Sequence, residues 1–298
     1  MNRFLSMAVI AATFTCAQPA LAAKDSVSPD GVRVEKMSRL RTLVPESELN
    51  AAAGQQYSEL LQQARQKGVL VPESHPQVQR LRGIAERIIP EAKRWNESAP
   101  GWKWEVNLID TEDINAFCMP GGKIAFFSGI LQKLKLTDDE AAIVMGHEVA
   151  HALREHSRER LAKSGITNVG ASVLGFGLSA LFGIDPNVTN TVAEAGASLA
   201  ILKFSRSDET EADLVGLDIA ARAGYDPRAG ITLWRKMGMV SKNGPPQWLS
   251  THPAGTARIA QMEKHMAQVL PLYAKVKGVP VKSLPPYESN VKGIAPVK

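Results

Sequence analysis

The chain of 298 residues is 44% hydrophobic and 22% charged, which supplies enough apolar side chains for a hydrophobic core in one or two domains. Ordinary counts of 23 glycines and 18 prolines exclude a collagen-like or low-complexity chain. A mean hydropathy of −0.12 excludes a polytopic membrane protein. The formal net charge of +5 arises from 35 basic and 30 acidic residues that are interleaved, so no nucleic-acid partner is predicted.

The amino-terminal residues have the pattern of a secretory signal peptide. Arg3 precedes an apolar stretch, and Ala20 and Ala22 fit the small-x-small pattern of a cleavage site. We therefore expect residues 1–22 to be removed during export. A lipid anchor on Cys16 is the less favoured alternative, because the residues before this cysteine lack the usual Leu-Ala-Gly character.

The rest of the chain is expected to divide into an arm, one domain and a tail. Residues 23–44 are polar and aperiodic, which predicts an extended arm. Residues 45–270 carry the periodic segments and the motifs and form the expected domain, which ends in a helix at 254–270. A proline-rich tail, 271–298, follows.

Helices and strands are predicted in the first part of the domain. Apolar residues recur at helical spacing over 45–68 and again over 76–95. The spacing then changes to alternation over 102–108, which predicts a half-buried strand, and a second strand is expected at 123–127.

An apolar insertion with few charges occupies residues 164–202. Its uninterrupted apolar part is short of the roughly 20 residues that span a bilayer. We interpret the insertion as a helical hairpin packed over the active site or against a partner. Peripheral membrane contact is the alternative.

A helix with a metal-binding pattern is predicted from Thr137 onward. Thr137 and Glu140 form a capping box, and basic residues gather toward Lys163, so we expect one long helix over 137–163. It contains His147-Glu148-Val149-Ala150-His151.

The two histidines of this motif are separated by about 40° around the helix axis, so both imidazoles can bind one zinc ion. Glu148 is close enough to take a proton from a metal-bound water. The alternative is a pair of hydrogen-bonded core histidines. His156 lies well off the shared face, and we expect it to cap or pack.

A catalytic zinc ion needs a third protein ligand, and the acidic residues at 208–213 offer one. Glu209 and Asp213 share a helix face at i and i+4, whereas Glu211 points roughly opposite. We assign Glu209 as the ligand and Asp213 as a partner that hydrogen-bonds a ligand histidine. A solvated acidic helix start is the alternative.

Together these residues resemble the zinc metallopeptidases that include the CaaX prenyl proteases, HtpX and Oma1, and especially their periplasmic BepA-like and LoiP-like members. The likeness rests on four motifs in the family's order: Asn115-Ala116-Phe117 with Pro120-Gly121-Gly122, His147-Glu148-x-x-His151, Ser205-Arg206 followed by Glu209-x-x-Ala212-Asp213, and Thr251-His252-Pro253 with Arg258-Ile259.

The resemblance implies a gluzincin-like α+β fold, mainly α, with a small sheet beside the active-site helix. It implies that His147, His151 and Glu209 bind one zinc ion and that Glu148 is the catalytic base. Larger members carry a tetratricopeptide array, which is not found in this sequence, so docking through such repeats is not expected.

Two further motifs have less certain roles. Asn115, with Ala116 and Phe117, is interpreted as a substrate-binding segment that holds an extended polypeptide at the sheet edge; a turn asparagine is the alternative. His252 is expected near the site as a catalytic residue, where it could contact the metal, bind the oxyanion or cap a helix. Arg206 and Arg258 are expected to be structural residues beside the site.

The sequence thus predicts a periplasmic zinc metalloendopeptidase. The resemblance implies unfolded, misfolded or unassembled envelope proteins as substrates and outer-membrane assembly machinery as a possible partner. Two alternatives stay open: a chaperone-like binding protein with a blocked zinc site, and a metal hydrolase that acts on cell-wall peptides.

Overall fold

The computed structural model describes residues 31–165, 204–241, 246–252 and 256–298. The predicted signal peptide lies outside the described residues, as does the insertion from residue 166 to its end at 202. Residues 31–38 have no regular secondary structure, and a short 3-10 helix, η1 (Arg39–Leu43), ends the predicted arm.

A three-stranded sheet separates two groups of helices. The strands are β1 (Glu105–Ile109), β2 (Ala116–Met119) and β3 (Lys123–Phe127), in the order β1-β3-β2. β3 runs parallel to β1 and antiparallel to β2. The predictions of β1 and β3 are confirmed, but β2 was not predicted, because all four of its residues are buried and show no alternation.

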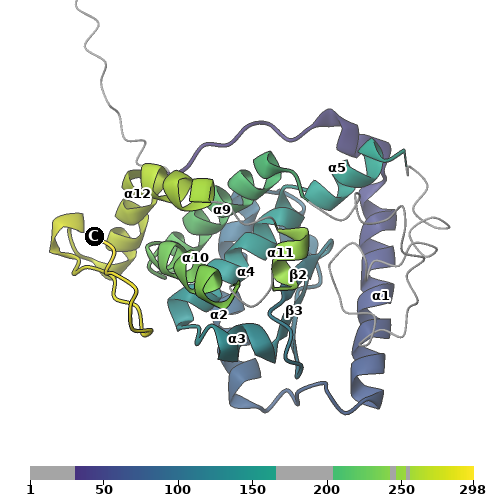
Figure 1. The fold of residues 1–298 in the computed structure, drawn as a ribbon. Helices are drawn as coiled ribbons and strands as arrows, with labels where there is room; N and C mark the ends of the chain where they lie inside the picture. Colours follow the sequence, from purple (N-terminus) through teal and green to yellow (C-terminus); the bar gives the residue numbers. More distant parts are fainter. Residues whose placement is uncertain (1–30, 166–203, 242–245, 253–255) are drawn as a thin grey trace, which may run out of the picture.

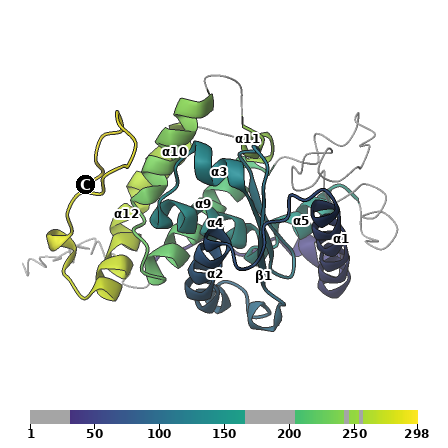
Figure 2. The same ribbon diagram turned by 90° about the horizontal axis from the view of Figure 1, so that it is seen from below.

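Helix α1 (Glu46–Gln66) covers one face of the sheet (Figure 2). Its Tyr57 hydroxyl donates to the carbonyl oxygen of Ile124 at 2.5 Å, and its ring meets Phe117 edge-on. The opposite face, which carries Val106 and Phe126, belongs to the main core and faces the other helices. The mainly helical α+β fold is therefore confirmed.

The second predicted helix is shorter than expected. α2 (Pro76–Ile88) gives way to a 3-10 helix, η2 (Ile89–Arg94), before residue 95 is reached. Pro90 stands in the first turn of η2 and has no backbone N–H to donate to the preceding turn.

The prediction of one long helix over 137–163 was wrong. The capping box of Thr137 and Glu140 is present, but α4 (Asp138–Leu153) ends and α5 (His156–Lys163) begins after Glu155, whose φ of 55° is left-handed. The Asn96 amide donates to the Leu153 carbonyl oxygen at 3.0 Å, and Arg158 pairs with the Glu155 carboxylate at 2.7 Å. These contacts hold a turn that the local sequence does not require.

Helix α9 (Arg206–Arg222) packs directly against α4 (Figure 1). Two glycines face each other at the contact: a Cβ on Gly216 would lie 2.7 Å from the His147 nitrogen, and one on Gly146 would lie 2.8 Å from the Gly216 carbonyl oxygen. The close backbone approach brings the carboxylates of α9 to the histidines of α4.

Three carboxy-terminal helices complete the fold: α10 (Ala229–Val240), α11 (Trp248–Thr251) and α12 (Thr256–Lys277). The helix expected to end at residue 270 continues through Pro271 to Lys277. The remaining tail packs back on the molecule, where the Tyr287 and Thr137 hydroxyls lie 2.9 Å apart.

The short helix α3 (Ser128–Lys133) connects β3 to the segment before α4, and a 3-10 helix, η5 (Val281–Ser283), lies in the tail. Across the described parts of the chain, no helix combines the length and the apolar character that crossing a bilayer requires.

Candidate active site

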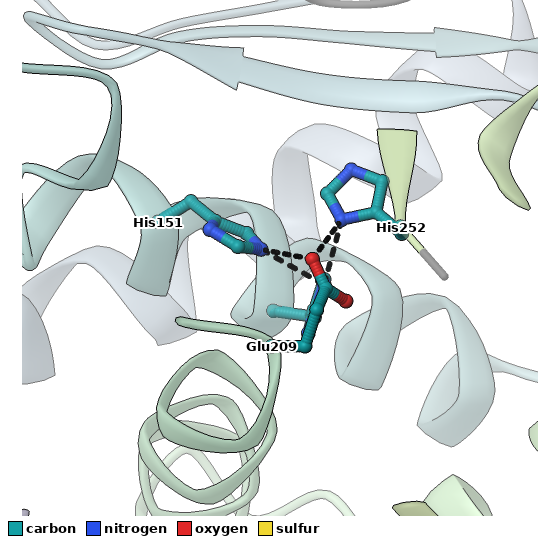
Figure 3. A group of neighbouring side chains, drawn as sticks. His151, Glu209 and His252 are labelled. Carbon is teal, nitrogen blue, oxygen red and sulfur yellow. Dashed lines mark hydrogen bonds and ion pairs between the residues drawn. The ribbon is translucent and has the colours of Figure 1, made fainter. Parts of the chain in front are cut away.

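Four buried side chains meet between α4, α9 and α11. His147 and His151 come from α4, Glu209 from α9, and His252 follows α11; each is at most 3% exposed. One potential ligand atom from each lies within 4.8 Å of all the others. Figure 3 shows the Glu209 carboxylate directed at the rings of His151 and His252.

The separations between these atoms suit one small metal ion. The Nε2 atoms of His147 and His151 are 3.1 Å apart, and they lie 3.6 Å and 3.5 Å from the two Glu209 oxygens. His252 Nδ1 lies 3.3 Å from His147 Nε2. Tetrahedral zinc, with bonds of about 2.0 Å, separates its ligand atoms by about 3.3 Å. Three imidazoles and one carboxylate are also donors that zinc prefers, so the residues present fit a single zinc ion.

Glu148 lies beside this cluster, on the next residue of α4 after His147. Its Oε1 accepts a 2.7 Å hydrogen bond from the indole nitrogen of Trp248 and lies 3.6 Å from His252 Nε2. The carboxylate is buried and oriented by the tryptophan, which itself stacks on Trp234.

Asp213 and Arg258 form hydrogen bonds and ion pairs with the ligand residues His147 and Glu209. Asp213 Oδ1 lies 3.1 Å from His147 Nδ1, which leaves Nε2 of that ring free to bind a metal. The Arg258 guanidinium donates to Asp213 Oδ2 at 2.7 Å and to Glu209 Oε2 at 2.6 Å. One buried cation therefore fixes two buried carboxylates.

The site electrostatics follow from burial and from these pairs. Burial lowers the pKa of His151 well below its ordinary value, which favours the neutral imidazole that a metal requires. Desolvation acts to raise the pKa of Glu209, but the charge of His252 and hydrogen bonds from the histidines outweigh it and lower that pKa. Desolvation acts to lower the pKa of His252, but the carboxylates of Glu209 and Glu148 raise it overall.

Sequence reasoning missed one group of residues beside His151. His156 Nδ1 lies 2.9 Å from His151 Nδ1, and His156 Nε2 lies 3.1 Å from Glu211 Oε2. The expectation that His156 caps or packs overlooked this contact, because it placed both histidines on one continuous helix. Glu211 points away from the metal ligands, as expected, but toward His156. A third histidine just after the motif, with a spare carboxylate in 208–213, was the available signal.

The predicted substrate-binding segment lies along the edge of the sheet. Asn115 is buried immediately before β2. The residue before it, Ile114, accepts a 3.0 Å hydrogen bond at its carbonyl oxygen from the backbone nitrogen of Trp248. Ala116 is on the core side of β2, whereas the Phe117 side chain packs on the opposite face against Phe127.

Arg206, the other arginine that was expected beside the site, does not belong to the cluster. Arg206 is exposed at the first residue of α9, so the expectation of a structural contact beside the site fits Arg258 and not Arg206.

The fold and the donor set are those of a metal-dependent peptidase domain, in which a His-Glu-x-x-His helix faces a glutamate from a second helix. The sequence model of peptidase family M48 matches residues 73–266, and the chain belongs to this family.

Relatives of this chain carry peptidase names. The mitochondrial metalloendopeptidase OMA1 of Saccharomyces cerevisiae is 33% identical over 229 residues, which is 73% of this chain and 63% of the relative. The Arabidopsis thaliana protein of the same name is 37% identical over 179 residues, 59% of this chain and 35% of the relative. The beta-barrel assembly-enhancing protease of Escherichia coli is 30% identical over 174 residues, 55% of this chain and 35% of the relative. The chain thus matches between 35% and 63% of the length of these relatives.

Proposed function

We propose that this protein is a zinc-dependent metalloendopeptidase in which His147, His151 and Glu209 hold the ion and Glu148 is the general base. The observation that carries the proposal is the buried cluster itself, whose donor atoms lie at zinc-ligand separations beside an oriented carboxylate. Membership of peptidase family M48 supports the same chemistry.

The residues around the cluster can be given tasks in peptide hydrolysis. His147, His151 and Glu209 would hold the zinc ion, which would supply a Lewis acid to polarise the scissile carbonyl and make water a better nucleophile at neutral pH. Glu148 takes the proton of the attacking water and gives it to the departing amine. Trp248 orients that carboxylate, and Asp213 keeps the Nδ1 proton on His147, which leaves Nε2 of that ring available as a metal ligand.

The substrate class that best suits this site is an extended, unfolded polypeptide. β2 is an edge strand of the sheet and packs against α4, which carries the cluster. A peptide that pairs with an edge strand is recognised through its backbone, which a folded protein does not offer. Asn115 lies immediately before β2, and we place it beside the main chain of such a peptide.

We further propose that the protein works in the periplasm on misfolded or unassembled envelope proteins. The signal-like residues 1–22 support export. The name of the Escherichia coli relative, a beta-barrel assembly-enhancing protease, supports a link to the assembly of β-barrel proteins. The OMA1 relatives are mitochondrial by name, so the peptidase chemistry is common to relatives in different compartments.

A second candidate is a chaperone-like binding protein whose metal site is blocked. The observation that favours it is His252, whose Nδ1 lies 2.9 Å from Glu209 Oε1. An imidazole bound as a fourth ligand would fill the position that a catalytic zinc ion leaves open for water. Such a protein would hold unfolded chains without cleaving them.

Unfolded casein distinguishes the two candidates. Wild-type protein should cleave casein, and cleavage should be lost after chelation, return with added zinc, and be absent in Glu148→Gln. Exposed Glu263 on α12 provides a matched Glu→Gln control that should cleave normally. Binding of casein without cleavage by wild-type protein, with the zinc ion present, would favour the blocked site.

A further inference from the structure

A chain of three polar side chains, His156, Glu211 and Arg154, leads away from His151. His156, 2% exposed, bridges His151 Nδ1 at 2.9 Å and Glu211 Oε2 at 3.1 Å. Arg154 then donates from Nε to Glu211 Oε1 at 2.6 Å. The order from the cluster outward is His151, His156, Glu211 and Arg154.

The order of donors and acceptors in this chain follows from its outer end. Arginine is always protonated and only donates, so the Glu211 carboxylate beside Arg154 accepts. It accepts from His156 Nε2 as well, so a neutral His156 ring carries its proton on Nε2 and leaves Nδ1 as an acceptor. His156 Nδ1 can then receive a hydrogen bond only if His151 carries its proton on Nδ1. His151 Nε2 is thereby left unprotonated, and this is the atom that faces Glu209 at 3.5 Å.

The local backbone is built to make this contact. His156 would lie far from His151 on a continuous helix, because five residues rotate a side chain by about 140° around the axis. The left-handed Glu155, with φ of 55°, ends α4 and starts α5 so that His156 reaches back. A non-glycine residue in this conformation is uncommon, and here Arg41 and Arg158 both pair with its carboxylate.

The ring of His151 is also fixed on its faces. Phe204 stacks on it with ring centroids 3.9 Å apart and planes inclined by 26°. Stacking limits the tilt of the imidazole but does not choose between its two tautomers. The hydrogen bond to His156 supplies that choice.

We infer that His156 and Glu211 are positioning residues that hold His151 in the tautomer and orientation required for zinc binding through Nε2. The inference rests on the proposed function, because it assigns a task within the same metal site. On α4 the two ligand histidines are then held in matching ways: His147 through Asp213 and Arg258, and His151 through His156, Glu211 and Arg154.

Two substitutions at His156 test this directly. His156→Phe keeps a ring but removes the acceptor, whereas His156→Asn places an amide oxygen near the position of Nδ1. Zinc affinity is measured by competition with a chromogenic chelator, without any peptide substrate. We expect His156→Phe to weaken zinc binding by about 10- to 100-fold, and His156→Asn to restore a clear part of the loss. Equal affinity in wild type and His156→Phe overturns the inference, as does His156→Asn binding no better than His156→Phe.

The tautomer has its own readout. Long-range proton–nitrogen NMR spectra of histidine-labelled, zinc-loaded protein should show His151 protonated on Nδ1 in wild type. Glu211→Gln leaves His156 in place and is the second variant if His156→Phe does not fold. It should make the other His156 tautomer detectable and weaken zinc binding toward the lower end of that range. An unchanged spectrum together with unchanged affinity contradicts the inference.

A matched control variant and a zinc titration of the wild-type protein distinguish failure of the positioning role from failure of the proposed function. His265 on α12 bonds the Gln261 carbonyl oxygen at 2.8 Å, away from the site, so His265→Phe should bind zinc normally. If wild-type protein itself binds no zinc, the proposed function fails. If wild type binds zinc and His156→Phe binds it equally well, only the positioning role fails.

Discussion

The indole nitrogen of Trp248 donates a hydrogen bond of 2.7 Å to Glu148 Oε1. Trp248 begins α11, and His252 directly follows that helix, so one short element contacts both the proposed base and the ligand cluster. The Trp248 ring also meets the His147 ring at a centroid distance of 5.5 Å. The position of the base is thus set by a helix that is far from α4 in sequence.

Replacing Trp248 by phenylalanine should lower catalysis without removing zinc. Phenylalanine retains the stack on Trp234 but cannot donate to Glu148. A hydrogen bond to a charged group contributes about 1.5–3 kcal/mol, so kcat/KM for a peptide should fall about tenfold or more. Zinc stoichiometry should stay at the wild-type value. Unchanged or increased kcat/KM would contradict the orienting role.

The glycine contact between α4 and α9 should be sensitive to a single methyl group. In Gly216→Ala the added Cβ would meet the His147 nitrogen at 2.7 Å, so the helices must separate. We expect a loss of about 1–3 kcal/mol in the free energy of unfolding, together with weaker zinc binding, because Glu209 is on the displaced helix.

Gly238→Ala in α10 is the matched control for this change. Nothing lies within 4 Å of a Cβ at that position, so alanine should be neutral or stabilise the helix by up to about 1 kcal/mol. Similar unfolding curves for the two variants would show that the close approach of α4 and α9 does not limit stability.

Arg258→Met should strongly destabilise the metal-free protein. The substitution leaves the carboxylates of Asp213 and Glu209 buried without their shared cation. Removal of one partner of a buried ion pair costs about 3–5 kcal/mol. Lys133→Met breaks an exposed pair with Glu112 and should cost less than about 1 kcal/mol by the same urea denaturation measurement. Equal losses in both variants would refute the pairing argument.

The stability difference between wild type and Arg258→Met should depend on pH in a defined direction. Desolvation raises the pKa of Asp213, but the charge and hydrogen bonds of Arg258 outweigh it and hold that pKa below its ordinary value. A lowered folded-state pKa contributes stability above the unfolded value of about 3.9, and this contribution is lost as pH falls through the folded value. The difference should therefore be full near neutral pH and shrink below about pH 4. A difference that grows with acidity would contradict this sign.

Cys118 should be unreactive in the folded protein. Burial is the main reason that its thiol pKa lies well above the ordinary value, and the Glu148 charge adds to it. In a Cys16→Ser protein, an aromatic disulfide reagent should label Cys118 only after denaturation. Because the raised pKa belongs to the folded state, stability should decline as pH rises above the unfolded thiol value of about 8.5. Rapid labelling of Cys118 in native protein at neutral pH would contradict this prediction, because it would show that the thiol is accessible to solvent.

Much of the metal cluster could be predicted because it depends on the spacing of residues within single helices. The spacing of His147 and His151 and that of Glu209 and Asp213 each place two side chains on one helix face, whatever the tertiary fold. His252 could be placed near the site only through the family resemblance. Its contacts with Glu209 and Glu148 depend on where α11 packs.

The missed features depend on contacts between distant segments. The left-handed Glu155 was not predicted, because two of the side chains that hold it, Asn96 and Arg41, come from distant parts of the chain. Without that turn, His156 and Glu211 could not be connected to His151. β2 was missed for a different reason: a strand buried on both faces lacks the alternation that marked β1.

The measurement that most directly tests the central claim is the zinc content of the purified protein, determined by mass spectrometry of the metal after exhaustive dialysis. We predict one zinc ion per wild-type chain and clearly less than one in His147→Ala, because that substitution removes one of the three proposed ligands, His147, His151 and Glu209. A wild-type protein that carries no zinc and takes up none, or a His147→Ala protein that keeps a full equivalent, would contradict it.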